Sequence, residues 1–348
     1  MFLSIELAVI IEKLVLIIIV VMGSLVVAMY MTYGERKVAG LLQDRPGPNR
    51  AGPFGLLQPL ADGMKLFFKE EIVPAFSSKA LFIMGPALAM LTAIMTSAVI
   101  PWGDKVHFFD RDISLQIADV NIGILYVFGV VSLGVYGIMI GAWASNNKYS
   151  LLGGLRAASQ IISYELAMGI SIIALLMLTG TLSLKEMVLQ QQAGNWNIIY
   201  QPLGFLIFLI CAFAECNRTP FDLAEAESEL IGGYHTEYSS MKLGFYLFAE
   251  YINMFISSAV MASLYFGGYD MPFFNEAAHA DWGNWLALIG IAAFMFKIII
   301  FIFIFMWVRW TVPRFRYDQL MHLGWRILIP LALFNMLATR AAILYFGK

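Results

Sequence analysis

Ionisable side chains interrupt the apolar segments of this sequence. Glu165, Glu215, Glu250 and Lys297 each lie inside or at the end of a long uncharged run. Charged groups at bilayer depth are costly, and they commonly mark ion pathways or proton relays. A buried, hydrogen-bonded group that only locks helices together is an equally good interpretation of each residue by itself.

The densest acidic stretch begins at Glu215, where an apolar run ends. Its carboxylates are Glu215, Asp222, Glu225, Glu227 and Glu229, with Arg218 as the nearby cation. Pro220 breaks any continuous helix, and the spacing beyond it predicts one helical face with Asp222, Glu225 and Glu229. A solvated acidic loop is the simpler alternative. Carboxylates crowded at low dielectric cannot all ionise, so this stretch could instead exchange protons near neutral pH.

The elements that position these residues are apolar segments of membrane-spanning length. Hydrophobic residues make up 60% and charged residues 13% of the 348 positions, whereas soluble domains have about 45–50% and 25%. This composition excludes a soluble enzyme, a disordered scaffold and a nucleic-acid-binding module. The runs lack the alternation of barrel strands, so we predict an all-α polytopic protein of one transmembrane domain. Eight spans are expected, near 14–33, 80–102, 122–144, 161–182, 198–214, 243–266, 285–308 and 323–345.

Lysines and arginines predict how these spans are oriented. Most of them fall in the loops that follow the first, third, fifth and seventh spans. By the positive-inside rule these loops face the cytoplasm, so both termini face the outer side. Glu6 and Glu12 precede the first span and no small-residue cleavage site follows it, so no cleavable signal peptide is expected.

Residues 54–71 predict an amphipathic helix at the cytoplasmic surface. Leu60 and Phe67 lie on an apolar face, and Asp62 and Lys65 lie on a polar one. Such a segment is too short and too polar to span, and it suits an interfacial position. The two cysteines and four scattered histidines of the chain form no pattern of metal or iron–sulfur ligands, so no metal site and no catalytic redox centre are expected.

Several motifs in order along the chain resemble one family, the H-type membrane subunits of the proton-pumping NADH:quinone oxidoreductase, respiratory complex I. Their mitochondrial counterpart is NADH dehydrogenase subunit 1. The matching blocks are Gly34–Gly40, Arg45–Arg50, Leu56–Gly63, Ile162–Glu165, Glu215–Asp222, Glu225–Glu227, His235–Tyr238 and Arg309–Leu320.

The resemblance implies a role in quinone reduction and proton translocation for the residues that it covers. The quinone chamber would be lined by Glu35, Arg36, Asp62, Lys65, Phe67, Glu225 and Glu227. A proton relay would follow through Glu165, Glu215, Asp222, Glu229 and Glu250, with Lys297 as a cationic partner for one of the acids. Subunit contacts would involve Arg45, Arg50, Arg314 and Arg316. Phospholipid headgroup binding for the first two arginines, and topological anchoring for the last two, are equally good interpretations.

The resemblance also implies partners and a location. Quinone would be the substrate, and flavin and iron–sulfur clusters would belong to partner subunits, with no cofactor held by this chain. The partners would be peripheral quinone-site subunits, small membrane-arm subunits and membrane lipids, and not nucleic acid. The location would be the bacterial cytoplasmic membrane. The alternatives are the homologous subunit of a membrane-bound hydrogenase, a transporter acting alone and a purely structural anchor.

Overall fold

The computed structural model describes residues 2–108, 111–271 and 283–346, and these residues are almost entirely helical. The predicted all-α fold is confirmed. One antiparallel hairpin joins β1 (Lys105–Phe108) to β2 (Arg111–Ser114), with Val106 opposite Ile113. The helices are α1 Phe2–Leu42, α2 Gln58–Phe68, α3 Lys79–Thr96, α4 Gly123–Ala144, α5 Lys148–Thr179, α6 Leu184–Ala193, α7 Asn197–Tyr200, α8 Pro202–Glu215, α9 Glu227–Leu230, α10 Ser240–Tyr265, α11 Asn284–Thr311, α12 Tyr317–His322 and α13 Ile329–Phe346.

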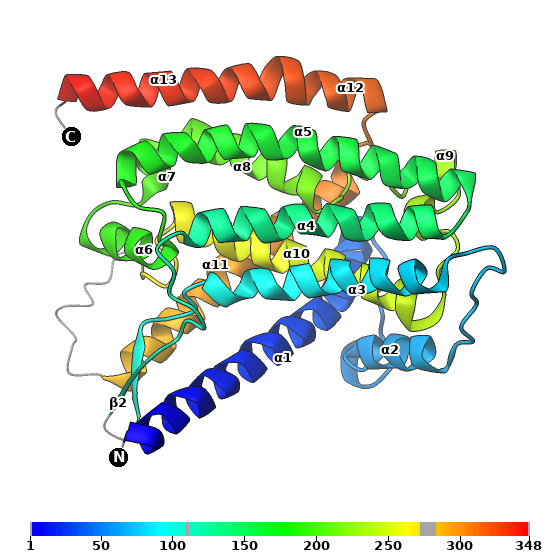
Figure 1. Cartoon of the computed structure of the whole chain (residues 1–348), viewed down its shortest axis with the longest axis horizontal. Helices are drawn as coiled ribbons and strands as arrows, with labels where there is room; N and C mark the ends of the chain where they lie inside the picture. Colours follow the sequence, from blue (N-terminus) through cyan, green and yellow to red (C-terminus); the bar gives the residue numbers. More distant parts are fainter. Residues whose placement is uncertain (1, 109–110, 272–282, 347–348) are drawn as a thin grey trace.

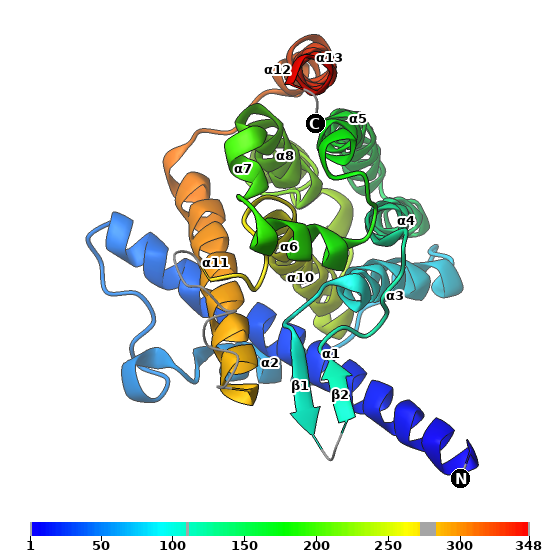
Figure 2. The ribbon, with the colours of Figure 1, turned by 90° about the vertical axis from the view of Figure 1, so that its left-hand side faces the viewer.

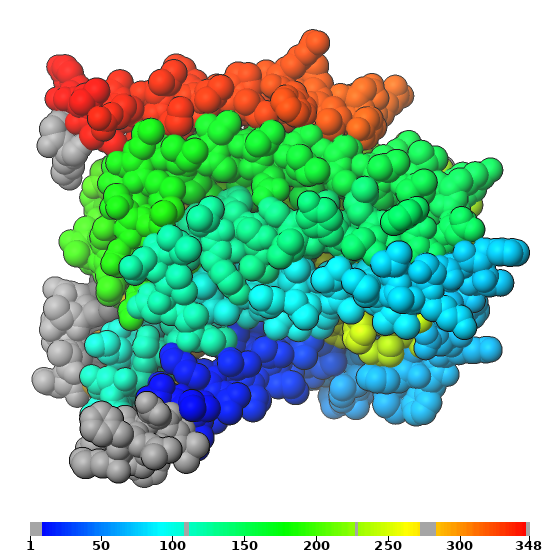
Figure 3. Space-filling view, in the orientation of Figure 1, coloured from blue at the N-terminus to red at the C-terminus, as the bar shows by residue number. Residues whose placement is uncertain are grey.

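The long helices form a row backed by a second layer. Helices α3, α4 and α5 lie side by side, and α12 and α13 continue the row beyond α5 (Figure 1). The space-filling view shows the same row as parallel ridges (Figure 3). Seen from the side, α8 and α10 lie behind the row, while α1 and α11 cross it obliquely (Figure 2). Helix α10 packs against α1, α3, α8 and α11, so it is the central helix of the core.

Helix lengths bear on the predicted spans. Within the described residues, seven helical segments are long and apolar enough to cross a membrane. Helix α8 is apolar but has only 14 residues, which is about 21 Å against a hydrocarbon core of about 30 Å. Helix α5 begins at Lys148, well before the predicted start at 161. That all eight segments cross the bilayer within a single domain stays a prediction.

The predicted amphipathic segment contains α2, preceded by a short 3-10 turn at Pro53–Gly55. Pro59 lies in the first turn of α2, where its missing N–H costs nothing. Leu60 and Phe67 are exposed, as expected for an apolar face that meets lipid or another subunit. The loop before α2 folds tightly, because a Cβ on Gly55 would lie 2.2 Å from the carbonyl oxygen of Pro48.

The acidic stretch differs from both predictions made for it. Residues 216–226 are not helical, and the next helix is the single turn α9. The shared helical face predicted for Asp222, Glu225 and Glu229 is therefore wrong. A solvated loop is wrong too, because Cys216 to Ala224 are buried between the helices. Backbone bonds secure this buried loop, such as those from Arg218 N to Phe213 O and from Phe315 N to Pro220 O.

Candidate functional site

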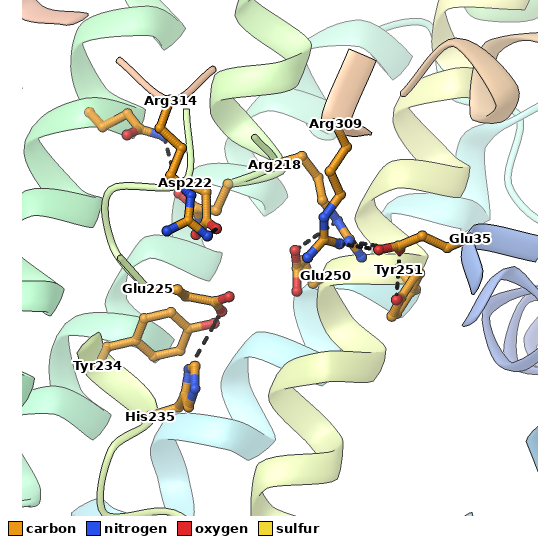
Figure 4. Close-up of polar contacts among 12 residues, drawn as sticks. Glu35, Arg218, Asp222, Glu225, Tyr234, His235, Glu250, Tyr251, Arg309 and Arg314 are labelled. Carbon is orange, nitrogen blue, oxygen red and sulfur yellow. Dashed lines mark hydrogen bonds and ion pairs between the residues drawn. The ribbon is translucent and has the colours of Figure 1, made fainter. Parts of the chain in front are cut away.

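A buried network of ion pairs is centred on Arg218, which reaches the core from the loop after α8. Its Nη1 lies 3.0 Å from Glu35 Oε2 of α1, and its Nε lies 2.7 Å from Glu250 Oε1 of α10. The second oxygen of Glu35 pairs with Arg309 Nη1 of α11 at 2.6 Å. The hydroxyl of Tyr251 donates to Glu35 at 2.8 Å, and the Arg218 guanidinium lies 4.2 Å from the centre of the Tyr251 ring. Four separate segments of the chain thus meet at this site (Figure 4).

The charges of this Arg218 network balance. The side chains of Arg218, Glu35 and Glu250 are only 3%, 8% and 10% exposed. At such burial an unpaired charge is strongly destabilising, so two arginines facing two carboxylates is the arrangement expected. A change of charge on any neighbouring group would be felt strongly, since screening by water is weak here.

A second acidic group lies beside the Arg218 network and is built from the same loop. Arg314 Nη2 lies 3.2 Å from Asp222 Oδ2, while Tyr234 donates to Glu225 at 2.8 Å. His235 Nδ1 lies 3.5 Å from the same Glu225 oxygen (Figure 4). These contacts hold Asp222 and Glu225 on neighbouring sides of the network.

The two carboxylates of this second group titrate in opposite directions. Burial, reinforced by the charge of Glu225, raises the pKa of Asp222 to about 7, although Arg314 opposes the shift. Burial acts on Glu225 as well, but the hydrogen bond and charge of His235 and the bond from Tyr234 outweigh it and lower the pKa of Glu225. One acid therefore holds its proton up to neutral pH while its neighbour is ionised, as in other carboxylates that exchange protons.

Two small cavities continue from this region into the bundle. Their volumes are about 30 and 40 Å³, and both are lined by Glu215, Cys216 and Asn253. The second cavity is also lined by Glu250. A water needs at least about 10–15 Å³ of such space and two or more polar partners, so each cavity has room for a few waters. Glu165 of α5 accepts a hydrogen bond from Ser132 and interacts electrostatically with Glu215.

The predicted chamber residues on α1 and α2 are joined by one contact. Arg36 Nη1 lies 2.6 Å from Asp62 Oδ2, and Gln58 donates to the other Asp62 oxygen at 3.1 Å. This pair ties α2 to α1 beside Glu35. Lys65 and Phe67 are exposed on α2.

Other predicted residues lie outside the buried groups. Glu229 forms an exposed ion pair with Arg156 at 2.6 Å. The Lys297 ammonium donates to the carbonyls of Phe266, Gly268 and Asp270 at 2.7, 2.9 and 2.5 Å. Since Phe266 is 16 residues beyond Glu250 in the chain, this places Lys297 about 24 Å along α10 from that acid.

The predicted interface arginines are on the surface, and one predicted acid cannot be placed. Arg45 and Arg50 are exposed on the loop before α2, and Arg316 is exposed before α12. Glu227 begins α9, but its side chain lies outside the described residues. No group of three or more possible metal ligands occurs among the residues searched, which are those the structure describes.

Several residues that complete the site have no role that the sequence assigns. Arg309 and His235 lie within motifs that match the family, but by the sequence alone they are only a positive loop charge and a scattered histidine. Tyr234, Tyr251 and Ser132 supply hydroxyls to the carboxylates without any special spacing. Both tyrosines directly adjoin an ionisable residue, which is a weak signal that could have drawn attention to them.

Comparison with known proteins places this arrangement in context. The family model described as NADH dehydrogenase matches residues 14–340. The first of the H-type subunits of NADH-quinone oxidoreductase from Cytophaga hutchinsonii is 65% identical over 335 residues, covering 96% of this chain and 97% of the relative. The H-type subunit of Flavobacterium psychrophilum is 66% identical, covering 97% and 99%. That of Leptospira biflexa is 49% identical, covering 92% and 91%.

Proposed function

Because this chain belongs to the NADH dehydrogenase family, we propose that it forms the membrane side of a quinone-binding chamber and the first part of a buried charge relay. The family predicted from the motifs is confirmed. The chain is a multi-pass membrane subunit of the NADH-quinone oxidoreductase complex, and other subunits of that complex are its partners. The close relatives favour this assignment over a hydrogenase subunit or a transporter acting alone.

The proposed chamber lies where α1, α2 and the buried loop meet. Glu35, Arg36 and Asp62 lie on or between α1 and α2, and Glu225 lies in the loop that faces them through Arg218. Lys65, Phe67 and Glu227 belong to the same proposed wall by their places in the sequence. A long apolar quinone tail could pass along the exposed apolar face of α2. The quinone is the substrate in this proposal, while flavin and iron–sulfur clusters are held by partner subunits.

The Arg218 network is the observation that carries the proposal. It joins Glu35, near the proposed chamber, to Glu250, which lines a cavity that also contains Glu215. Quinone reduction consumes two protons and therefore changes the charge beside Glu35, Asp222 and Glu225. At low dielectric such a change alters the energy of neighbouring ion pairs by several kcal/mol. Protons could then redistribute along Glu250, Glu215 and Glu165.

The contacts support some predicted relay residues more than others. Asp222 is buried beside the Arg218 network, so it belongs to the proposed relay. Glu229 and Lys297 lie outside it, because the first is at the surface and the second is near the other end of α10. Their part in a relay would need a conformational change.

The proposed orientation places the chamber on the cytoplasmic side of the bacterial inner membrane. Both termini then face the periplasm, and the exposed arginines Arg45, Arg50 and Arg316 face the peripheral subunits. Arg314 would contribute to the same interface, since its side chain is 42% exposed although it pairs with Asp222. The positive-inside distribution supports this orientation.

Glutamine substitution at Glu215 tests the relay. Glu215→Gln keeps the shape and a hydrogen-bonding group but removes the titrating proton. We expect an assembled complex that still oxidises NADH with an artificial soluble acceptor and has at least tenfold lower quinone-linked turnover and proton pumping, as general acid–base groups contribute about 10²–10⁴-fold. Glu227→Gln should behave in the same way.

Glu237→Gln is the matched control, because Glu237 only accepts a hydrogen bond from Asn147 at 2.6 Å. A glutamine can accept the same bond, so turnover and pumping should be unchanged. Normal quinone reduction and pumping in assembled Glu215→Gln complexes would refute the relay.

A further inference from the structure

An apolar hollow opens between the amino-terminal half of α1 and the helices α10 and α11. Its volume is about 210 Å³. Gly23 and Ser24 lie on the α1 side, Phe255 on the α10 side and Met295 on the α11 side, while Trp102 belongs to the segment before β1. Ser24 contributes the one hydroxyl of the described lining, and this hydroxyl donates to the carbonyl of Val20 at 2.7 Å. The hollow therefore presents a surface of hydrocarbon.

The oblique course of α1 creates this hollow. Its carboxyl-terminal half packs near α10 and α11, whereas its amino-terminal half diverges from the bundle (Figures 1 and 2). Gly23 lies where the divergence begins, and a Cβ built there would have no atom within 4 Å. No side chain of the described residues fills the space, and the neighbouring residues Ile18 and Ile19 are 60% exposed. In a bilayer, lipid chains surround this part of α1.

We propose that the hollow binds one acyl chain of a phospholipid whose phosphate lies at Lys13. An apolar protein cavity of about 150 Å³ binds benzene, so 210 Å³ suffices for a segment of hydrocarbon chain. Water gains nothing there, since the lining has no free polar group to bond it. An acyl chain entering from the bilayer replaces the contacts that the diverging helix loses.

The position of Lys13 supports this occupant. Lys13 precedes the lining residue Leu16 by one helical turn, and its Nζ donates to the carbonyl of Gln116 at 3.0 Å, next to the lining residue Leu115. An ammonium at the end of the hollow can pair with a lipid phosphate. The ten residues from Lys13 to Gly23 span about 15 Å, which is the hydrocarbon thickness of one leaflet. The acid nearest in sequence, Glu12, lies about 100° around the helix from Lys13.

This site is separate from the proposed quinone chamber. Gly23 lies 12 residues before Glu35 on the same helix, which is about 18 Å along α1. The inference therefore does not depend on the proposed function, and its test does not use enzyme turnover.

Photolabelling in nanodiscs tests the proposal on the intact complex. The probe is phosphatidylglycerol with a diazirine in the middle of one acyl chain, and mass spectrometry locates the labelled residues. We expect labelling to concentrate on peptides that contain Phe255 and Met295. Gly23→Phe fills the hollow and should lower that labelling about tenfold, which corresponds to losing roughly two buried methylene contacts. Lys13→Gln should lower it as well.

Gly129→Phe is the matched control. Gly129 is also an exposed glycine in a spanning helix with nothing within 4 Å of an added Cβ, but it lies on α4 away from the hollow. Its labelling should equal that of the unmodified complex. Labelling unchanged by Gly23→Phe or by Lys13→Gln would overturn the proposal. Displacement of the probe by a long-chain quinone but not by unlabelled phosphatidylglycerol would overturn it too, because the occupant would then be a quinone tail.

Discussion

Removing one charge from the Arg218 network should destabilise the chain more than removing two. Arg218→Met leaves Glu35 and Glu250 facing Arg309 alone, and Glu250→Gln leaves two arginines facing Glu35. Each single variant thus buries one uncompensated charge, and breaking such a buried pair costs about 3–5 kcal/mol. The double variant retains the Glu35–Arg309 pair at 2.6 Å and is neutral, so it should lose less than either single variant.

The two buried cysteines provide the assay. Cys211 and Cys216 are free and buried, so their alkylation reports opening of this subunit within the intact complex. Mass spectrometry of the alkylated peptides across a temperature series gives a midpoint for each variant. Single variants should lower the midpoint by about 6–10 °C, taking about 2 °C per kcal/mol for a chain of this size.

Lower pH gives an independent check of the same reasoning. A proton on Glu35 or Glu250 can replace the cation that Arg218→Met removes, so this variant should recover stability as the pH falls. Glu250→Gln should not recover, because its excess charge is positive. Midpoint losses of the two single variants that simply add in the double variant would show that charge balance does not hold this network together.

Other predictions concern the second acidic group, the α2 face and the topology. Asp222 has a pKa raised to about 7, so its contribution to stability is lost as the pH rises from about 4 to 7. Asp222→Asn should remove this dependence and flatten the pH profile of quinone reduction near 7, and an unchanged profile would contradict the assignment. Phe67→Arg should impair quinone reduction but leave NADH oxidation by a soluble acceptor intact, and equal loss of both activities would exclude the α2 route. Cysteines near Lys105 should react with an impermeant maleimide from the outer face and those near Lys148 only from the cytoplasmic face, with the reverse pattern refuting the orientation.

The amino-acid sequence alone determined the class of the protein and the identity of its family. Long uncharged segments cannot fold stably in water, and backbone groups in a bilayer must bond within helices, so composition alone predicts an all-α membrane protein. The pattern of residues 54–71 likewise predicted α2, because amphipathic spacing depends only on local helical geometry. Buried acids stood out as candidates because charge at membrane depth is rare.

Only the tertiary structure decided which charges meet. Arg218 and Glu35 are 183 residues apart in the chain, and Arg309 reaches the same carboxylate from α11. No local spacing encodes such contacts, because they depend on how α1, α10 and α11 cross. The acidic stretch illustrates the same limit. Its periodicity predicted a helical face, but burial of the loop between helices replaced helical hydrogen bonds with contacts to α8 and to Phe315. The packing of distant helices, rather than local propensity, therefore determined the arrangement of the site.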